Sequence, residues 1–122
     1  MPLYVLRKGK KARLFEKTRL ADNAFKRFKG LMLESKKNFD YALIFELPAE
    51  TRYGASIHML FMRFPIDALF LDSGKKIADF AENLKPWSLN FTPKKKAKFI
   101  VEMPAGSIRR FKLEVNDRIS LN

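Results

Sequence analysis

The chain contains no cysteine, and this absence removes several classes of site. Without thiols it has no disulfide, no thiolate metal site, no iron–sulfur cluster and no cysteine nucleophile. A chain of this kind suits a reducing compartment, so we expect a cytoplasmic protein. Histidine is almost as scarce, since His58 is the only one. A His-based zinc site or a Ser-His-Asp relay would have to be built around that single imidazole.

Long apolar runs and glycine-rich motifs are missing as well. No stretch approaches the ~20 apolar residues needed to cross a bilayer, and the start, MPLYVLRKGKK, turns basic too early for a signal peptide. The five glycines are scattered and form neither a GxxxxGK[ST] nor a GxGxxG loop. We therefore expect no membrane insertion, no nucleotide hydrolysis, and neither a metal nor another cofactor.

Acidic residues are few: 13 Asp and Glu face 25 Lys and Arg, which gives a net charge of +12. The excess lies toward both ends of the sequence. If the two ends meet in the fold, their side chains would form one basic face able to attract a phosphate backbone. The other interpretation is a solvated surface without a polyanionic partner, a composition also typical of thermophile proteins. The residues of the possible nucleic-acid face are Lys10, Lys11, Arg13, Lys94, Lys95, Lys96 and Lys98.

Apolar residues are abundant, at 47% of 122 residues with twelve Phe, which suits a single domain spanning 1–122. Helical spacing and a C-terminal Gly30 predict one helix from Asp22 to Leu31, and Ser107 can cap a short helical turn. Alternation and turn residues predict eight short strands. These lie near residues 3–7, 12–17, 41–47, 57–61, 65–72, 76–80, 97–103 and 118–121. We predict a β-rich α+β fold, an antiparallel sandwich or a partly closed, jelly-roll-like barrel.

Four short segments, in order, resemble the family called domain of unknown function 192. They are Arg27–Met32 (RFKGLM), Phe64–Asp72 (FPIDALFLD), Val101–Gly106 (VEMPAG) and Asn116–Asp117. The resemblance runs from about Thr18 to Ile119. It implies a β-rich jelly-roll or distorted barrel and carries no established activity, cofactor or substrate.

Two positions depart from the family pattern. His58–Met62 (HMLFM) replaces a Trp-Met-Lys-Asn-Thr run, so no polar role of that run is transferred to this chain. Asn116 replaces a glycine, a mild change because Asn tolerates left-handed backbone.

The candidate site lies in the apolar run from Ile57 to Asp72, which contains a few polar residues. Polar groups in such a run need a partner or belong to a site. One interpretation pairs Arg63 with Asp67 and Glu102 inside the core, fixing the bend at Pro65. The other turns Arg63 outward as an anion clamp held by Asp67. A metal or catalytic set of His58 with the two carboxylates is the third interpretation.

We therefore expect a monomeric binding module, not an enzyme, that presents an apolar, Arg-containing surface to an unknown ligand or protein. One apolar set suits either an adaptable binding groove or a core, and both uses stay open: Met32, Met59, Met62 and Met103 with Phe61, Phe64 and Trp87. The candidate surface residues are His58, Met62, Arg63, Pro65, Asp67, Trp87 and Glu102. The alternative is a nucleic-acid-binding protein that uses the basic residues of both ends.

Overall fold

The computed structural model describes residues 1–21, 31, 35–88 and 90–121. These residues form eight strands and very little helix. The strands are β1 (Leu3–Arg7), β2 (Lys10–Phe15), β3 (Thr18–Ala21), β4 (Ala42–Thr51), β5 (Ile66–Leu71), β6 (Ile77–Leu84), β7 (Ala97–Pro104) and β8 (Arg118–Ser120). Two 3-10 turns, η1 (Lys36–Asn38) and η2 (Tyr53–Ala55), and one short helix, α2 (Ser107–Arg110), complete the described elements.

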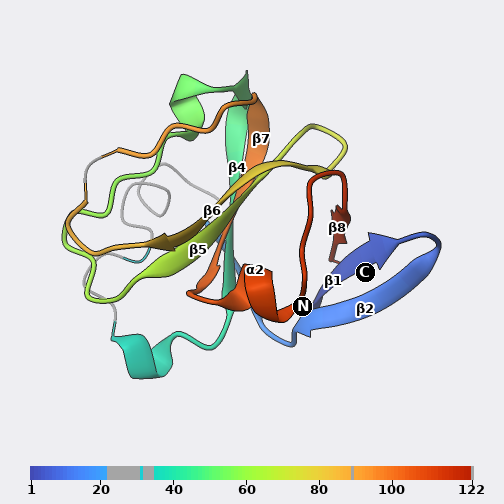
Figure 1. The fold of residues 1–122 in the computed structure, drawn as a ribbon, viewed down its shortest axis with the longest axis horizontal. Helices are drawn as coiled ribbons and strands as arrows, with labels where there is room; N and C mark the ends of the chain where they lie inside the picture. Colours follow the sequence, from blue (N-terminus) through green and yellow to red (C-terminus); the bar gives the residue numbers. More distant parts are fainter. Residues whose placement is uncertain (22–30, 32–34, 89, 122) are drawn as a thin grey trace.

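The strands form two sheets, as Figure 1 shows. One sheet has five strands in the order β3-β4-β7-β5-β6, and the other has three in the order β2-β1-β8. The predicted β-rich architecture and its hairpins β1–β2 and β5–β6 are confirmed. Among the described residues the two sheets remain separate, in a sandwich-like arrangement, and do not close into a barrel.

One strand pair contradicts the all-antiparallel prediction. β3 pairs with β4 in parallel, with Thr18 opposite Ala42. Parallel neighbours need a crossover of a dozen or more residues, and the twenty residues from 22 to 41 are long enough. No strand is predicted for residues 18–21, because four residues are too few to show an alternation.

Buried side chains lie on both faces of the five-stranded sheet. On β5, Ile66, Ala68 and Phe70 pack in one apolar cluster, as the alternation predicted. Leu69 and Leu71 point to the opposite face, where the second cluster also takes in residues of the three-stranded sheet. Since all six residues of β5 are buried, this strand lies in the centre of the core.

The strand predicted for residues 57–61 is wrong. Only Ile57 makes a bridge, to Phe91, and the chain then turns through residues 60 and 61. Phe61 has a φ of 62°, which no strand accommodates. The strand predicted for residues 41–47 is too short, because β4 continues through Pro48 to Thr51. Its ladder is irregular between Glu46 and Thr51, where a proline is tolerated.

The helices differ from the prediction as well. The expected helix of Asp22 to Leu31 lies outside the described residues, except for Leu31, which is buried. α2 occurs where a helical turn was expected, but Ser107 is not its cap. Gly106 holds the N-cap position, and the Ser107 hydroxyl donates a 2.5 Å hydrogen bond to the carbonyl of Pro104. Within the described residues, no helix is long and apolar enough to cross a membrane.

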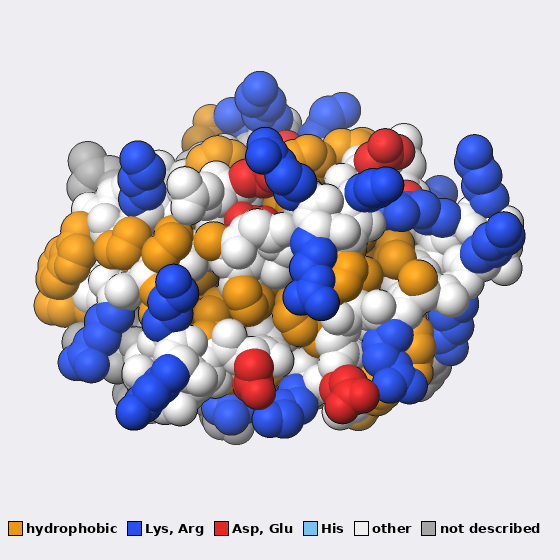
Figure 2. All heavy atoms as spheres, turned by 60° about the horizontal axis from the view of Figure 1, so that its bottom comes forward, with side chains coloured by type: hydrophobic (Ala, Val, Ile, Leu, Met, Phe, Trp, Pro, Cys, Tyr) orange, Lys and Arg blue, Asp and Glu red, His pale blue; other side chains and the backbone are white. Residues whose placement is uncertain are grey.

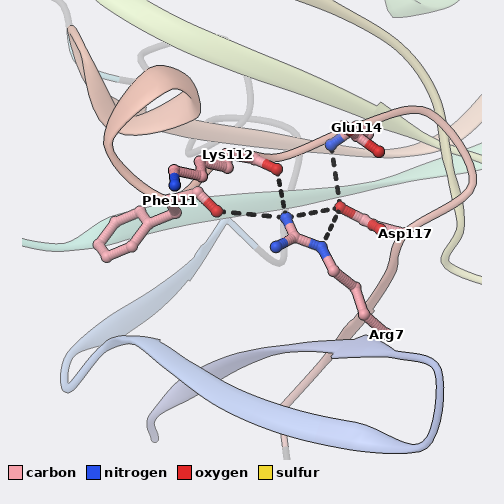
Figure 3. Close-up of polar contacts among 5 residues, drawn as sticks. All are labelled: Arg7, Phe111, Lys112, Glu114 and Asp117. Atoms are coloured by element: carbon pink, nitrogen blue, oxygen red, sulfur yellow. Dashed lines mark hydrogen bonds and ion pairs between the residues drawn. The ribbon is translucent and has the colours of Figure 1, made fainter.

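The two ends of the described chain are joined, because β1 pairs with β8. A polar cluster reinforces the junction (Figure 3). Arg7 Nε donates to Asp117 Oδ2 at 2.8 Å, and the same guanidinium donates to the backbone carbonyls of Phe111 and Lys112. Asp117 Oδ2 also accepts the Glu114 N–H at 2.9 Å. One ion pair thereby fixes both the first strand and the loop before the last one.

Candidate functional site

Asp67 is fully buried and is held by backbone groups of two other segments. Its Oδ1 accepts the N–H of Asn83 at 2.9 Å, and its Oδ2 accepts the N–H groups of Gly106 and Ile108 at 3.1 and 2.9 Å. Three donors satisfy most of the acceptor capacity of a carboxylate. Asp67 therefore ties β5 to β6 and to the start of α2.

Glu102 lies on the opposite face of the same sheet. It stands opposite Ala68 on β5 and Leu43 on β4, both members of the first cluster, whereas Asp67 stands opposite Met103 of the second. In the described part of the chain, no hydrogen bond or ion pair reaches the Glu102 carboxyl group. Burial raises the pKa of Glu102 from 4.5 to about 8. Its carboxyl group is thus mainly protonated at neutral pH.

Arg63 does not join these carboxylates. Its side chain is exposed, while Asp67 and Glu102 are buried, and among the described residues no ion pair connects them. His58 is half-buried, and its Nδ1 accepts the backbone N–H of Leu60 at 3.3 Å. Because Asp67 and Glu102 face opposite sides of one sheet, the three residues cannot surround one metal ion or reacting atom.

The remaining candidates divide between core and surface. Met62 is 4% exposed and packs in the first cluster, as Met59 does, so both are core residues. Pro65 is half-buried at the start of β5. Trp87 is 58% exposed. It lies in the connection between β6 and β7, beside the loop that leads into β5.

These two loops bring together two exposed aromatic side chains, both of which belong to the apolar set that suits either a groove or the core. The rings of Phe61 and Trp87 have centroids 5.0 Å apart and are tilted by 60°. Phe61 is 48% exposed, and neighbouring Leu60 is 38% exposed. We call Leu60, Phe61 and Trp87 the aromatic platform. No periodicity signals Phe61 as a surface residue, because it stands within an apolar run.

The backbone holds the aromatic platform in an unusual conformation. Phe61 and Trp87 have φ values of 62° and 65°, a region that bulky residues rarely occupy. Hydrogen bonds join the two loops: Trp87 N–H donates to the Met59 carbonyl at 2.7 Å, and Met59 N–H donates to the Ser88 carbonyl at 3.3 Å. Strained backbone of this kind concentrates at functional sites.

The platform lies at one end of the molecule. Figure 1 places residues 57–65 and the connection after β6 together at its left edge. Figure 2 shows hydrophobic side chains at the same end and along the middle of that face, with Lys and Arg spread over the whole face, including beside the hydrophobic end.

The basic residues of the nucleic-acid alternative are divided between distant places. Lys94 to Lys96 precede β7 at the top of Figure 1, whereas Lys10, Lys11 and Arg13 lie on β2 at its lower right. Several are already engaged. Arg13 pairs with Glu16 at 3.1 Å, and Lys98 lies 3.5 Å from Glu46. The pairing of β1 with β8 joins the chain ends without gathering these side chains on one face.

Metal ligands do not converge either. The described residues contain no group of three or more His, Cys, Asp and Glu side chains that could hold a metal ion. The geometry thus provides a buried structural carboxylate, a buried protonated carboxyl group and an exposed aromatic surface.

Comparison with solved structures relates the fold to two bacterial proteins. One is a putative transcription regulator from Sinorhizobium meliloti 1021, with a TM-score of 0.85 and 22% identity over 98% of this chain and 91% of that chain. The other is a protein of unknown function from Novosphingobium aromaticivorans, with a TM-score of 0.84 and 19% identity over 98% and 83% of the two chains. At these identities the likeness establishes the fold alone.

Sequence relatives come from thermophilic archaea. A UPF0127 protein of Thermococcus kodakarensis is 52% identical over 85% of this chain, which spans 64% of that relative's length. A UPF0127 protein of Pyrococcus furiosus is 49% identical, with 94% of this chain and 93% of the relative covered. The family model of DUF192, described as "Uncharacterized ACR, COG1430", matches residues 5–121. The chain therefore belongs to the DUF192 (UPF0127) family of uncharacterised proteins, as its four sequence segments predicted.

Proposed function

We propose that this protein is a non-catalytic binding module whose aromatic platform docks an acidic, partly apolar segment of another protein. The observation that carries the proposal is the contact of Phe61 with Trp87, two half-exposed aromatic rings held by strained backbone. Exposed aromatic side chains of this kind are typical binding hot spots.

The apolar part of the partner is inferred from exposure. Seven large hydrophobic side chains of the described residues are exposed, and three of them, Leu60, Phe61 and Trp87, belong to the platform. Single exposed apolar residues are common on protein surfaces, but a contiguous group favours an interaction site. Complementary apolar side chains of a partner would remove this group from water.

The acidic part of the partner is inferred from charge. Exposed cations stand two residues from each ring: Arg63 follows Phe61, and Lys85 precedes Trp87. The whole chain carries a net charge of +12, which attracts acidic partners over long range and speeds their association. Arg63 is thereby assigned to the outward-facing, anion-binding role.

A peptide selection tests the proposal. Random peptides displayed on phage would be selected on the protein, and selected peptides titrated by fluorescence anisotropy. We expect sequences with apolar residues flanked by Asp or Glu. Phe61→Ala should weaken their binding roughly tenfold or more, as expected for a hot spot. Binding should also change the emission of Trp87, the only tryptophan in the chain.

Tyr53→Ala is the matched control, because Tyr53 is an aromatic residue 73% exposed on η2, outside the platform. It should leave peptide binding unchanged. A selection that yields no binding sequence, or binding that Phe61→Ala and Tyr53→Ala affect equally, would refute the proposal.

Oligonucleotides at low and moderate salt test the alternative partner in the same assay. Nucleic-acid binding should be strongest at low salt because it releases counterions. A variant with Lys94, Lys95 and Lys96 replaced by Gln should then lose oligonucleotide binding, whereas Phe61→Ala should bind as the wild type does. That result would favour the basic residues over the aromatic platform as the binding surface.

Three further proposals rest on the sequence. We propose that residues 1–122 act as a single domain, that the module is a monomer, and that it works in the cytoplasm. A chain without cysteine suits that reducing compartment.

A further inference from the structure

A cavity of about 440 Å³ lies between the two sheets, away from the aromatic platform. Its walls include Leu3 of β1, Ile44 of β4, Phe99 of β7 and Ile119 of β8. This volume falls within the range of ~300–1,000 Å³ typical of small-molecule sites. Apolar walls from four strands favour an apolar ligand.

Two lysines also line the cavity, and they differ in how their charge is matched. The ammonium group of Lys98 donates a hydrogen bond to the Leu47 carbonyl and lies 3.5 Å from Glu46 Oε2, so a carboxylate already offsets its charge. Lys75 has no carboxylate partner among the described residues. Its Nζ instead lies 5.6 Å from the centre of the Phe99 ring.

The backbone of Lys75 is fixed beside the cavity. Its N–H donates to the Asp72 carbonyl at 2.9 Å, and its own carbonyl accepts the N–H of Ile119 at 2.9 Å. Ile119 and Phe99 are both wall residues. Lys75 is exposed at the edge of the cavity, with its backbone bonded to one wall residue, Ile119, and its ammonium group near the ring of another, Phe99.

We propose that this cavity binds an apolar molecule that ends in a carboxylate, as a fatty acid does. The tail would lie against Leu3, Ile44 and Ile119, and the carboxylate would pair with the ammonium group of Lys75. Charge complementarity selects this class, since a neutral apolar molecule would leave Lys75 unmatched and a cationic one would be repelled.

Isothermal titration calorimetry with octanoate and octan-1-ol tests the proposal, because the two ligands share a tail and differ in charge. We expect one octanoate per chain, bound roughly two- to fivefold more tightly than octan-1-ol, as suits a partly exposed ion pair. Lys75→Met should remove this difference, and Lys75→Arg should preserve it. Lys95→Met, at an exposed lysine outside the cavity, should leave both affinities unchanged.

Leu20→Trp tests the location. Leu20 lines the cavity and is 43% exposed, so a larger side chain can fill the space with little effect on the core. This variant should weaken both ligands, whereas Phe61→Ala should weaken neither. The proposal would be overturned if the wild-type chain did not bind octanoate, or bound it no more tightly than octan-1-ol. It would also be overturned if Lys75→Met or Leu20→Trp left octanoate binding unchanged.

Discussion

Asp67 and Glu102 are buried carboxyl groups of neighbouring strands, and their surroundings give them opposite properties. Asp67 accepts three backbone N–H groups, which satisfy most of the hydrogen-bonding capacity of its carboxylate oxygens. Glu102 is surrounded by Leu43, Ala68 and other residues of the first apolar cluster, and burial there favours its neutral form. One residue is a structural clamp, and the other is a proton-binding group inside the core.

Asp67→Asn should lower the free energy of unfolding by roughly 2–4 kcal/mol, measured by urea denaturation. The amide keeps one acceptor oxygen but turns an NH₂ group toward backbone donors, so at least one buried N–H loses its partner. Asp40→Asn is the control, because the one ion pair of Asp40 with a described residue is an exposed contact with Lys17, at 3.1 Å. Such pairs contribute ~0–1 kcal/mol. Equal effects of the two substitutions would contradict the clamp.

Glu102 should make the folded state less stable as pH rises. Its folded-state pKa, about 8, lies above the 4.5 of the unfolded chain, so the folded state binds more protons between these values. The free energy of unfolding therefore falls from about pH 4.5 upward and levels off above about pH 8. Glu102→Gln, which stays neutral, should lack this component.

The measurement is urea denaturation of both proteins at about pH 5 and about pH 9. The variant serves as the reference because the many lysines and other acids titrate equally in both chains. We expect Glu102→Gln to gain stability relative to the wild type at the higher pH. A difference between the two proteins that does not change with pH would refute the raised pKa.

At the scale of elements, the two loops of the aromatic platform carry a conformational cost. Phe61 and Trp87 occupy left-handed backbone, which costs a residue with a Cβ atom about 1–2 kcal/mol. The contact of the rings and the hydrogen bonds between the loops offset part of this cost.

Phe61→Gly should therefore be more stable than Phe61→Ala by about 1 kcal/mol, although glycine is the smaller residue. Both variants lose the ring, and only glycine adopts the left-handed conformation without strain. Thermal denaturation of the two variants is the measurement. Leu60→Gly against Leu60→Ala is the control, because Leu60 has no positive φ and glycine there should be the less stable. If glycine were less stable than alanine at both positions, or more stable at both, the backbone strain at Phe61 would be refuted.

The elements that the sequence predicted well are those whose local pattern matches their environment. The two hairpins and β5 combine alternation with a clear turn. The strand predicted for residues 57–61 is wrong because the apolar run resembles a strand, whereas in the fold it is a loop. Ile57 and Met59 fill the core from this loop, and Leu60 and Phe61 are exposed. β3 is not predicted for another reason: it is short, and its parallel pairing depends on a strand more than twenty positions away.

The candidate site was predicted in part. Trp87 and Arg63 are among the predicted surface residues. The sequence leaves Phe61 open between a groove and the core, because its exposure depends on a turn that the side-chain pattern does not encode. The sequence left open whether Arg63 meets Asp67 and Glu102. The answer depends on register, which places the two carboxyl groups on opposite faces of the sheet. A shift of one residue would have reversed this outcome.

At the scale of the whole molecule, the two sheets share one cluster of side chains. Leu3 and Ile119 of the three-stranded sheet pack with Leu69 and Val101 of the five-stranded sheet. The central strands are buried on both sides, so removal of the smaller sheet would expose apolar surface on the larger.

Unfolding should therefore be a single cooperative transition. Urea titrations followed by far-UV circular dichroism and by Trp87 emission should give one midpoint. Ile119→Ala should lower the free energy of unfolding by roughly 2–5 kcal/mol and should lower the midpoint equally at both probes, although Trp87 lies beside the other sheet. Val115→Ala, at a residue 48% exposed, should have little effect. A Trp87 midpoint unchanged by Ile119→Ala would divide the chain into two folding units.

The ion pair between Arg7 and Asp117 joins residues 110 positions apart. On the ribosome, β1 and β2 emerge first but must wait for β8, while β4 to β7 can already pair with one another. Closing so long a loop late is a slow step, because its entropy is lost before the contacts form. The cavity between the sheets, walled by Leu3 and Ile119, is completed only then. A nascent chain stalled before residue 118 has emerged would thus present one sheet with an open apolar face, a natural client for a chaperone.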